Sequence, residues 1–422
     1  MINETLIHAI KEYSIPLNHT SDLDFLIQNI QNQKYVLLGE SSHGTSEFYK
    51  IRAELSKKLI SEKGFTFLAV EGDWPACFEI NQYIKGIDHV DSNAREVLKS
   101  FNRWPTWMWA NEEMIELIDW LKTHNQTLPK EKQVGFYGID IYSLWESMDE
   151  IIKYLEKINS PDLEKAKEAF SCFEPYNRQP EKYGVSVAFY NEGCRNEVIG
   201  LLTKMNEEKR KHIKNEEDRL NLEVNALITA NAEQYYTTMI TDDNESWNIR
   251  DRHMVEVINK ITQTLDSNAK GIIWEHNTHV GDARATDMAN EGLVNVGQLM
   301  REQHGSHEVF IVGFGTHQGT VIAADQWGVN LEVMIVPPAQ KGSWEDLLHL
   351  AGSHDKLIMI NEENRSTFKQ RLGHRAIGVV YNPRHEHFGN YVPSVISDRY
   401  DAFIFVDHSN SLNPLKIEKV YL

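Results

Sequence analysis

The clearest chemical pattern in the sequence lies near its start, at residues 38–45 (LGESSHGT). A carboxylate, Glu40, precedes an imidazole, His43, by three residues, and a glycine stands next to each. Glycine adopts backbone angles that other residues avoid, so the segment suits a tight turn that presents polar side chains. A carboxylate beside an imidazole can orient the ring and raise its basicity. The turn therefore predicts a general base, although a helix start capped by Ser42 or Thr45 would also explain it.

A serine nucleophile fits this turn poorly. The nucleophile elbow of serine hydrolases reads G-x-S-x-G after a strand. Residues 39–43 read G-E-S-S-H, so a histidine stands where the second glycine is needed, and G-x-S-x-G occurs nowhere else in the chain. The sequence thus favours a base acting on water over a nucleophilic serine.

Titratable residues also follow two other apolar runs. Glu71 comes directly after residues 65–70 (FTFLAV), and His276 and His279 come shortly after residues 271–274 (GIIW). Histidines three residues apart share a face if the segment is helical, so they could bind zinc or donate hydrogen bonds to a substrate oxygen. The H-E-x-x-H zinc signature is absent. Glu71 has a structural alternative, because the E-G-D turn that it opens is typical of a helix start.

Arg52 lies on the predicted first helix. Near Glu40 and Glu71 its charge would offset the repulsion between two carboxylates, which otherwise raises their pKa values. The alternative is a surface ion pair with Glu47 or Glu54.

Three more residues are predicted to contact the substrate: Asp140, Trp74 and Trp107. Asp140 ends an apolar run, and Trp107 belongs to a dense tryptophan cluster at residues 104–109, for which core packing is the alternative. The histidines of His385-Glu386-His387 could bind metal, but turn residues surround them and exposure is expected.

Short apolar runs alternate with helical stretches along the chain. We predict strands at 35–38, 65–70, 134–139, 271–274, 309–314, 376–381 and 402–406, and a helix over 46–63. This alternation predicts an α/β fold with a central, largely parallel sheet flanked by helices. Residues that follow the strands would gather at the carboxyl edge of the sheet, where such folds usually bind ligands. Residues 148–264 have helical periodicity and few strand signals, so we predict an inserted helical subdomain there and a catalytic core formed by 1–147 and 265–422.

Composition excludes several classes of protein. The 422 residues include 62 acidic and 43 basic ones, a net charge of −19 that disfavours binding to nucleic acids and anionic membranes. No run of about 18 apolar residues predicts a membrane helix, and the charged N-terminal segment does not resemble a signal peptide. Three cysteines without a C-x-x-C pair suggest neither a structural zinc ribbon nor a disulfide framework, and suit a reducing cytoplasm.

Five segments, in order, resemble the erythromycin esterase family: GESSHGTSEFYKIRAEL, FLAVEGDWPA, GFYGIDIYSL, WEHNTHVGDAR and SDRYDAFIFVDHSNSLNPL. The resemblance spans nearly the whole chain. It implies a similar α/β fold with helical insertions and an active cleft beside the sheet. It also implies catalytic roles for the matching residues, namely His43 as the base that activates water, Glu40, Arg52, Glu71, His276 and His279.

The function that the resemblance implies is hydrolysis of a small-molecule ester or lactone by a bacterial, cytoplasmic and monomeric enzyme without a cofactor. Two alternatives remain open at this point. One is a metal-dependent hydrolase, because these histidines and carboxylates are the ligand types that zinc or manganese takes. The other is a non-enzymatic relative that binds haem or iron through its histidines. The physiological ester is not specified by the sequence.

Overall fold

The fold was analysed in a computed structural model that describes residues 2–87, 93–190, 193–201, 215–266 and 268–416. The chain divides into two compact units. The first comprises residues 1–69, 79–136 and 270–422, and the second comprises residues 70–78 and 137–269. The boundaries that we predicted at 147/148 and 264/265 stay a prediction.

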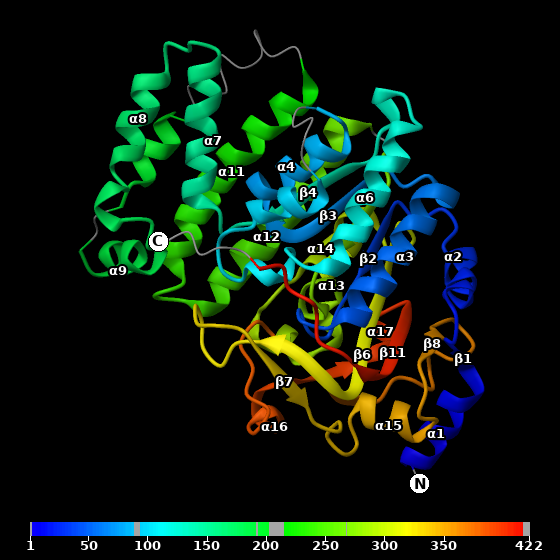
Figure 1. The fold of residues 1–422 in the computed structure, drawn as a ribbon. Helices are drawn as coiled ribbons and strands as arrows, with labels where there is room; N and C mark the ends of the chain where they lie inside the picture. Colours follow the sequence, from blue (N-terminus) through cyan, green and yellow to red (C-terminus); the bar gives the residue numbers. More distant parts are fainter. Residues whose placement is uncertain (1, 88–92, 191–192, 202–214, 267, 417–422) are drawn as a thin grey trace. The chain divides into compact units, whose positions relative to one another are not determined.

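A mixed sheet forms the centre of the fold, as the sequence predicts (Figure 1). Within the described residues it has nine strands in the order β1-β8-β11-β6-β2-β5-β3-β4, with β7 paired to β6. Strand β2 pairs in parallel with β5 and β6, and β6 pairs in parallel with β11. Strands β8 and β7 add antiparallel neighbours to β11 and β6. The strands of this sheet are β1 Ser14–Pro16, β2 Tyr35–Leu38, β3 Phe67–Asp73, β4 Gly135–Asp140, β5 Gly271–Trp274, β6 Val309–Ala323, β7 Glu332–Val336, β8 Lys356–Met359 and β11 Ala402–Ser409.

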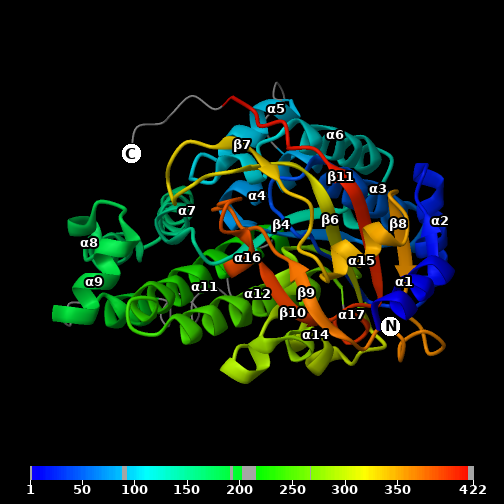
Figure 2. The ribbon, with the colours of Figure 1, turned by 90° about the horizontal axis from the view of Figure 1, so that it is seen from below.

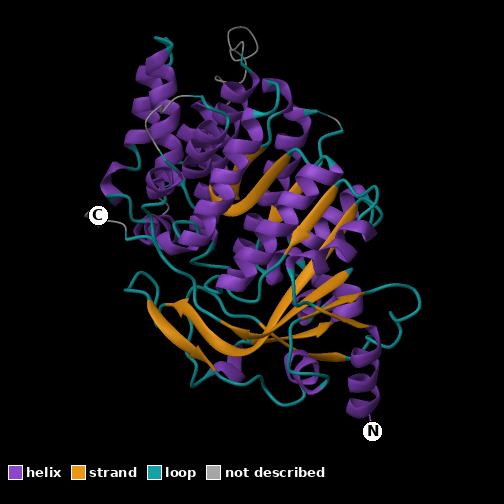
Figure 3. Ribbon diagram, turned by 45° about the vertical axis from the view of Figure 1, so that its right-hand side comes forward, coloured by secondary structure: helices purple, strands orange, loops and turns teal. Residues whose placement is uncertain are grey.

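A second sheet has two antiparallel strands, β9 (Arg371–Arg375) and β10 (Tyr391–Val395). Figure 3 shows the strands in orange. The helices of the first unit are α1 Ile2–Tyr13, α2 Asp24–Asn29, α3 Ser46–Lys63, α5 Ala94–Val97, α6 Glu112–Gln126, α13 Asn277–Val280, α14 Val296–His304, α15 Trp344–Leu350, α16 Glu386–Gly389 and α17 Ile396–Arg399. Helix α4, Trp74–Ile84, begins in the second unit and ends in the first.

Helices make up most of the second unit. They are α7 Leu144–Lys157, α8 Leu163–Ser171, α9 Pro180–Tyr190, α11 Glu216–Thr238 and α12 Asp243–Leu265. The long helices α11 and α12 pack side by side (Figure 2). Helix α12 begins at a favourable cap, because the Asp242 side chain accepts a hydrogen bond from the Glu245 amide. No helix in the described ranges is long and apolar enough to cross a membrane.

The parallel strands were the easiest elements to predict. The predicted ranges 35–38 and 271–274 coincide with β2 and β5, both fully buried. Strands buried on both faces read as continuous apolar runs, which is why these ranges stand out. The strand predicted at 376–381 is wrong. That segment makes only isolated bridges, in which the Ile377 amide bonds to Ser41 O and the Ala324 amide bonds to Val379 O.

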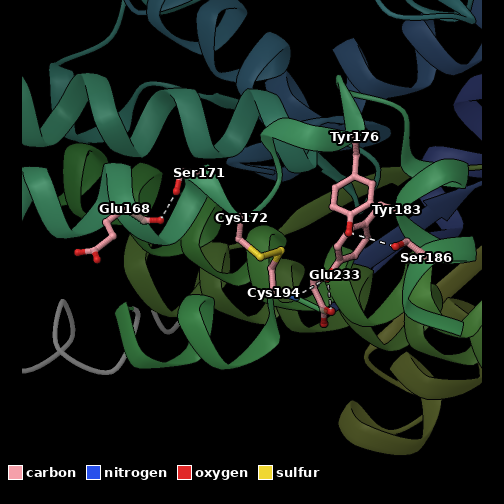
Figure 4. The surroundings of a disulfide bond; sticks show 8 residues. All are labelled: Glu168, Ser171, Cys172, Tyr176, Tyr183, Ser186, Cys194 and Glu233. Carbon is pink, nitrogen blue, oxygen red and sulfur yellow. Dashed lines mark hydrogen bonds between the residues drawn. A yellow bond between two sulfur atoms is a disulfide. The ribbon is translucent and has the colours of Figure 1, made fainter. Parts of the chain in front are cut away.

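The cysteine pattern suggested no disulfide framework, but the structure contains a disulfide. Cys172, directly after α8, forms a disulfide with Cys194 in the second unit, and Cys77 is free (Figure 4). Tyr183 of α9 lies beside the bond: its hydroxyl accepts a hydrogen bond from the Cys194 amide and donates one to Glu233. The two cysteines are 22 residues apart, so no local motif indicated the pair. Disulfides are rare in reducing compartments, so cysteine usage no longer supports a cytoplasmic location.

Candidate active site

The turn between β2 and α3 brings three of the predicted residues together in the first unit. Strand β2 ends at Leu38, and helix α3 begins at Ser46. His43 Nδ1 lies 2.8 Å from Glu40 Oε1, and Arg52 Nη2 donates a hydrogen bond to Glu40 Oε2. Glu40 therefore uses one carboxylate oxygen for the imidazole and the other for the guanidinium.

Arg52 is fully buried, and aromatic rings compensate its charge in addition to Glu40. Its guanidinium carbon lies 4.6 Å from the ring centres of both Tyr49 and Trp274. Cation–π contacts of this kind are worth about 2 kcal/mol when they are desolvated. The interpretation of Arg52 as a surface ion pair with Glu47 or Glu54 is therefore wrong. Arg52 thus fixes the carboxylate of Glu40, which in turn orients the His43 ring.

The partner of His43 determines the tautomer of its neutral ring. An ionised carboxylate only accepts hydrogen bonds, so in the neutral ring Nδ1 carries the proton and Nε2 carries the lone pair. The side chain keeps 9% of its surface exposed. A neutral imidazole oriented in this way can accept a proton through Nε2, as a general base must.

His276 lies next to His43 with the complementary proton arrangement. The two ring centres are 5.0 Å apart. His276 caps α13, because its Nδ1 accepts a hydrogen bond from the Thr278 amide. An Nδ1 that accepts leaves the proton of the neutral ring on Nε2, so the neutral His276 ring has a donor at Nε2, whereas the neutral His43 ring has an acceptor there.

His279, three residues further along α13, is buried in the same unit. Its predicted catalytic role stays a prediction. Trp107 is buried at 1% exposure in this unit, and its predicted contact with substrate is likewise untested.

Glu71 and Asp140 form a second polar cluster, in the second unit. Glu71 was expected to gather with Glu40 at the carboxyl edge of the sheet, where the strand order places β5 between β2 and β3. Arg250 of α12 binds both carboxylates: its Nε and Nη2 lie 2.9 and 2.7 Å from the two oxygens of Asp140, and Nη2 lies 2.7 Å from Glu71 Oε1. Burial lowers the pKa of Arg250, but Asp140, Tyr142 and Glu71 outweigh it and raise the pKa well above its ordinary value.

Arg250 was not among the residues singled out from the sequence. In the structure it shares a helix face with the buried residues Ser246, His253 and Val257, but the serine and histidine do not mark that face as buried in the sequence. A charged residue on an otherwise buried face indicates a buried partner.

Trp74 also belongs to the second unit. It is fully buried, stacks on Phe78 and Tyr137, and donates its indole hydrogen bond to Asn221. A cavity of about 490 Å³ lies elsewhere in this unit, with Trp145, Met148 and Phe170 among its lining residues. The residues that line this cavity include none of the predicted site residues.

Among the residues that the structure describes, no group of three or more His, Cys, Asp or Glu side chains is arranged to hold a metal ion. In the His385–His387 segment, Glu386 is buried against Arg375, whereas both histidines are exposed.

The structure is that of an α/β protein in which a buried histidine, carboxylate and arginine meet after a central strand, and comparison with known proteins names the family. The family profile described as Erythromycin esterase matches residues 60–409, so the chain belongs to the erythromycin esterase family. The match begins after Glu40, His43 and Arg52, so their assignment to the candidate site rests on their geometry alone.

Three relatives illustrate the similarity. The Bacillus subtilis (strain 168) protein named "Putative hydrolase YbfO" is 22% identical over 95% of this chain and 90% of its own length. The Escherichia coli "Erythromycin esterase type II" is 35% identical, over 31% of this chain and 30% of its own length. Among solved structures, a mutant of the erythromycin esterase EreC in its open conformation has a TM-score of 0.70 at 14% identity, covering 95% of this chain and 96% of that one. The EreC likeness concerns the fold, and family membership supports a hydrolase.

Proposed function

We propose that this protein hydrolyses a carboxylic ester or lactone with a water molecule activated by His43. The observation that carries the proposal is the complementary arrangement of two neighbouring imidazoles. In the neutral rings, the hydrogen bond to Glu40 places the lone pair of His43 on Nε2, and the hydrogen bond from the Thr278 amide places the proton of His276 on Nε2. The two ring centres are 5.0 Å apart. A base and a hydrogen-bond donor side by side are what ester hydrolysis by water needs.

In the proposed reaction, His43 Nε2 takes a proton from water while the water oxygen bonds to the ester carbonyl carbon. The carbonyl oxygen becomes an oxyanion, to which His276 donates a hydrogen bond. The bond from the carbonyl carbon to the alkoxy oxygen then breaks, and the His43 imidazolium returns its proton to the leaving alkoxide. Loss of one oxyanion donor typically costs roughly 2.7–4 kcal/mol.

Arg52 acts in this mechanism through Glu40, because its guanidinium is buried against that carboxylate. Catalytic roles for Glu71 and His279, and substrate contacts for Asp140, Trp74 and Trp107, remain predictions from the sequence and the family resemblance. The metal-free esterase is preferred to the metal and haem alternatives on membership of the erythromycin esterase family, because a histidine that donates Nδ1–H to a carboxylate is also typical of metal ligands.

A substrate panel tests the proposal. Wild-type protein would be assayed with erythromycin, a small lactone and p-nitrophenyl acetate, before and after dialysis against a chelator. We expect hydrolysis of at least one ester that survives dialysis. Hydrolysis lost on dialysis and restored by zinc or manganese would establish the metal-dependent alternative. No hydrolysis, together with a Soret band at one haem per chain, would establish the haem-binding one.

A further inference from the structure

Asn277, which stands between His276 and Thr278, is buried and bonded on every side. Its backbone amide donates to the Glu40 carbonyl oxygen at 2.8 Å. Its side chain pairs with β6 as a peptide group would: Nδ2 donates to Phe314 O at 2.6 Å, and Oδ1 accepts from the Phe314 amide at 3.2 Å. One residue therefore joins the end of β2, the start of α13 and strand β6.

The second proton of Asn277 Nδ2 points to a buried histidine–glutamate pair. His374 Nε2 lies 3.2 Å from Asn277 Nδ2, and His374 Nδ1 lies 2.5 Å from Glu345 Oε1. The Tyr400 hydroxyl also lies 3.1 Å from His374 Nε2. Both members of the pair are at most 1% exposed.

The charges of this pair determine which atom of Asn277 it can hold. Burial lowers the pKa of His374, so the ring is neutral. Burial raises the pKa of Glu345, but the neighbouring His374 and Arg375 outweigh this and lower it, so the carboxylate is ionised. The neutral ring donates through Nδ1 to Glu345 and accepts through Nε2, so it pairs with the amide nitrogen of Asn277 in the same side-chain orientation that Phe314 selects.

Burying a carboxylate and an imidazole is costly, and an apolar pair of the same volume is often as stable. Neither Glu345 nor His374 belongs to the proposed catalytic group, so the burial of this polar pair needs another explanation. Their link to Asn277 supplies one, because Asn277 adjoins the proposed oxyanion donor in sequence and bonds to the backbone of the residue that orients the base.

We infer that Asn277, oriented by the Glu345–His374 pair, is a positioning residue that sets the His276 imidazole against His43. The inference rests on the proposed function, because it assigns the pair a role in that same site. Misplacement of a reacting group by about 1 Å can cost roughly 100-fold in rate. Removing the acceptor on His374 therefore lowers turnover without a change in the groups that react.

The main test replaces the pair with apolar residues. In the double variant Glu345→Met with His374→Phe, the buried charge of Arg375 keeps its partner Glu386, and Asn277 keeps Phe314 O but loses the acceptor on His374. We expect kcat on the ester hydrolysed by wild type to fall about 10- to 100-fold, with KM within about twofold. His374→Gln alone can still accept from Asn277 and donate to Glu345, so it should retain most of the wild-type kcat.

Tyr400→Phe is the matched control, because it removes a hydrogen bond to the same nitrogen of His374 but leaves Asn277 in place. It should keep wild-type kcat. A direct readout is the side-chain ¹H–¹⁵N NMR spectrum of the histidines: in the double variant the His276 resonances should move, and those of the exposed His385 should not.

Unchanged kcat and unchanged His276 resonances in a folded double variant would overturn the inference. An equal loss of kcat in Tyr400→Phe would also overturn it, because the loss would then not depend on the bond between His374 and Asn277. If wild type hydrolyses no ester, the proposed function fails by itself, whereas the His276 resonances still test whether Asn277 positions that ring.

Discussion

At the scale of single residues, one carboxylate organises the proposed base. Glu40 accepts from His43 through one oxygen and from Arg52 through the other. An amide at this position has only one acceptor, so it would turn a donor toward one of these two partners. The charge of Glu40 and its two acceptors are thus both needed.

Glu40→Gln should therefore lower kcat on the hydrolysed ester by about 10- to 100-fold, because His43 is no longer held with Nδ1 protonated. Buried Arg52 would also lose its counter-charge, so the variant should be less stable by about 3–5 kcal/mol. Steady-state kinetics at a temperature where the variant is folded, and urea unfolding, measure the two effects.

Glu113→Gln provides the control for loss of a buried carboxylate in the same unit. Glu113 accepts hydrogen bonds from Ser46 and Asn413 and does not contact His43 in the described contacts. Its variant should keep wild-type kcat. If both variants lose kcat equally, Glu40 has no special relation to the base.

The buried side chain of His253 in α12 makes the stability of the protein depend on pH. Burial lowers its pKa to about 4 from 6.5. Between these pH values the unfolded chain binds more protons than the folded one, so stability rises with pH and is lost as the pH falls from 6.5 toward 4. At about 1.4 kcal/mol per pKa unit, the full effect is roughly 3 kcal/mol.

His253→Phe should remove this contribution. Urea unfolding at pH 7, 6, 5 and 4 should give a smaller loss of stability on acidification for the variant than for wild type. Parallel curves for the two proteins would show that His253 is not the group responsible.

At the scale of elements, the turn after β2 depends on close backbone contact at Gly44. Its carbonyl oxygen accepts hydrogen bonds from the amides of Ile322 and Leu412. A Cβ at this position would collide with the backbone of Ile322 in β6. Backbone cannot rotate away as a flexible side chain can, so only glycine fits here.

Gly44→Ala should destabilise the protein by about 1–3 kcal/mol, the usual cost of forcing extra volume into a packed site, and should lower kcat because the turn carries His43. Gly378→Ala is the matched control, since a Cβ there meets nothing closer than 3.9 Å. Thermal unfolding of both variants tests the prediction, and equal Tm values would contradict it.

The elements also show what sequence could predict. Strands β2 and β5 were located to the residue because continuous apolar runs indicate burial on both faces. The antiparallel strand β7 was missed although residues 333–336 (VMIV) form an apolar run, and Val333 and Ile335 of that run are exposed in the structure. Residues 376–381 are apolar enough for a strand but bond to the turn at Ser41 and to Ala324 instead.

The candidate site was also predictable only in part. Glu40, His43 and Arg52 could be proposed because they lie close together in sequence, at a strand end and on the next helix. Arg250 and Asn277 could not, because their partners are far away in the chain and only the folded structure reveals them. Long-range polar networks leave no periodic pattern in a sequence.

At the scale of the whole molecule, the two units differ in how they are held together. The first unit contains the parallel centre of the sheet, whereas the second is largely helical and contains the disulfide between Cys172 and Cys194. Closing a loop of 22 residues restricts the unfolded chain by roughly 3 kcal/mol. The disulfide thus stabilises the helical unit.

The double variant Cys172→Ser with Cys194→Ser should lower the unfolding free energy by roughly 3 kcal/mol, while kcat at low temperature stays near the wild-type value. Thiol titration of unfolded wild type without reductant should find one thiol, that of Cys77. Three thiols in protein purified without reductant would contradict the pairing.

The central claim is that His43 is the base that activates water. The most direct measurement compares kcat for His43→Ala and for His385→Ala, a histidine on the exposed surface, on the ester that wild type hydrolyses. With both variants folded, the account predicts a loss of about 10²- to 10⁴-fold for His43→Ala and none for His385→Ala. Hydrolysis by folded His43→Ala at the wild-type rate would contradict it.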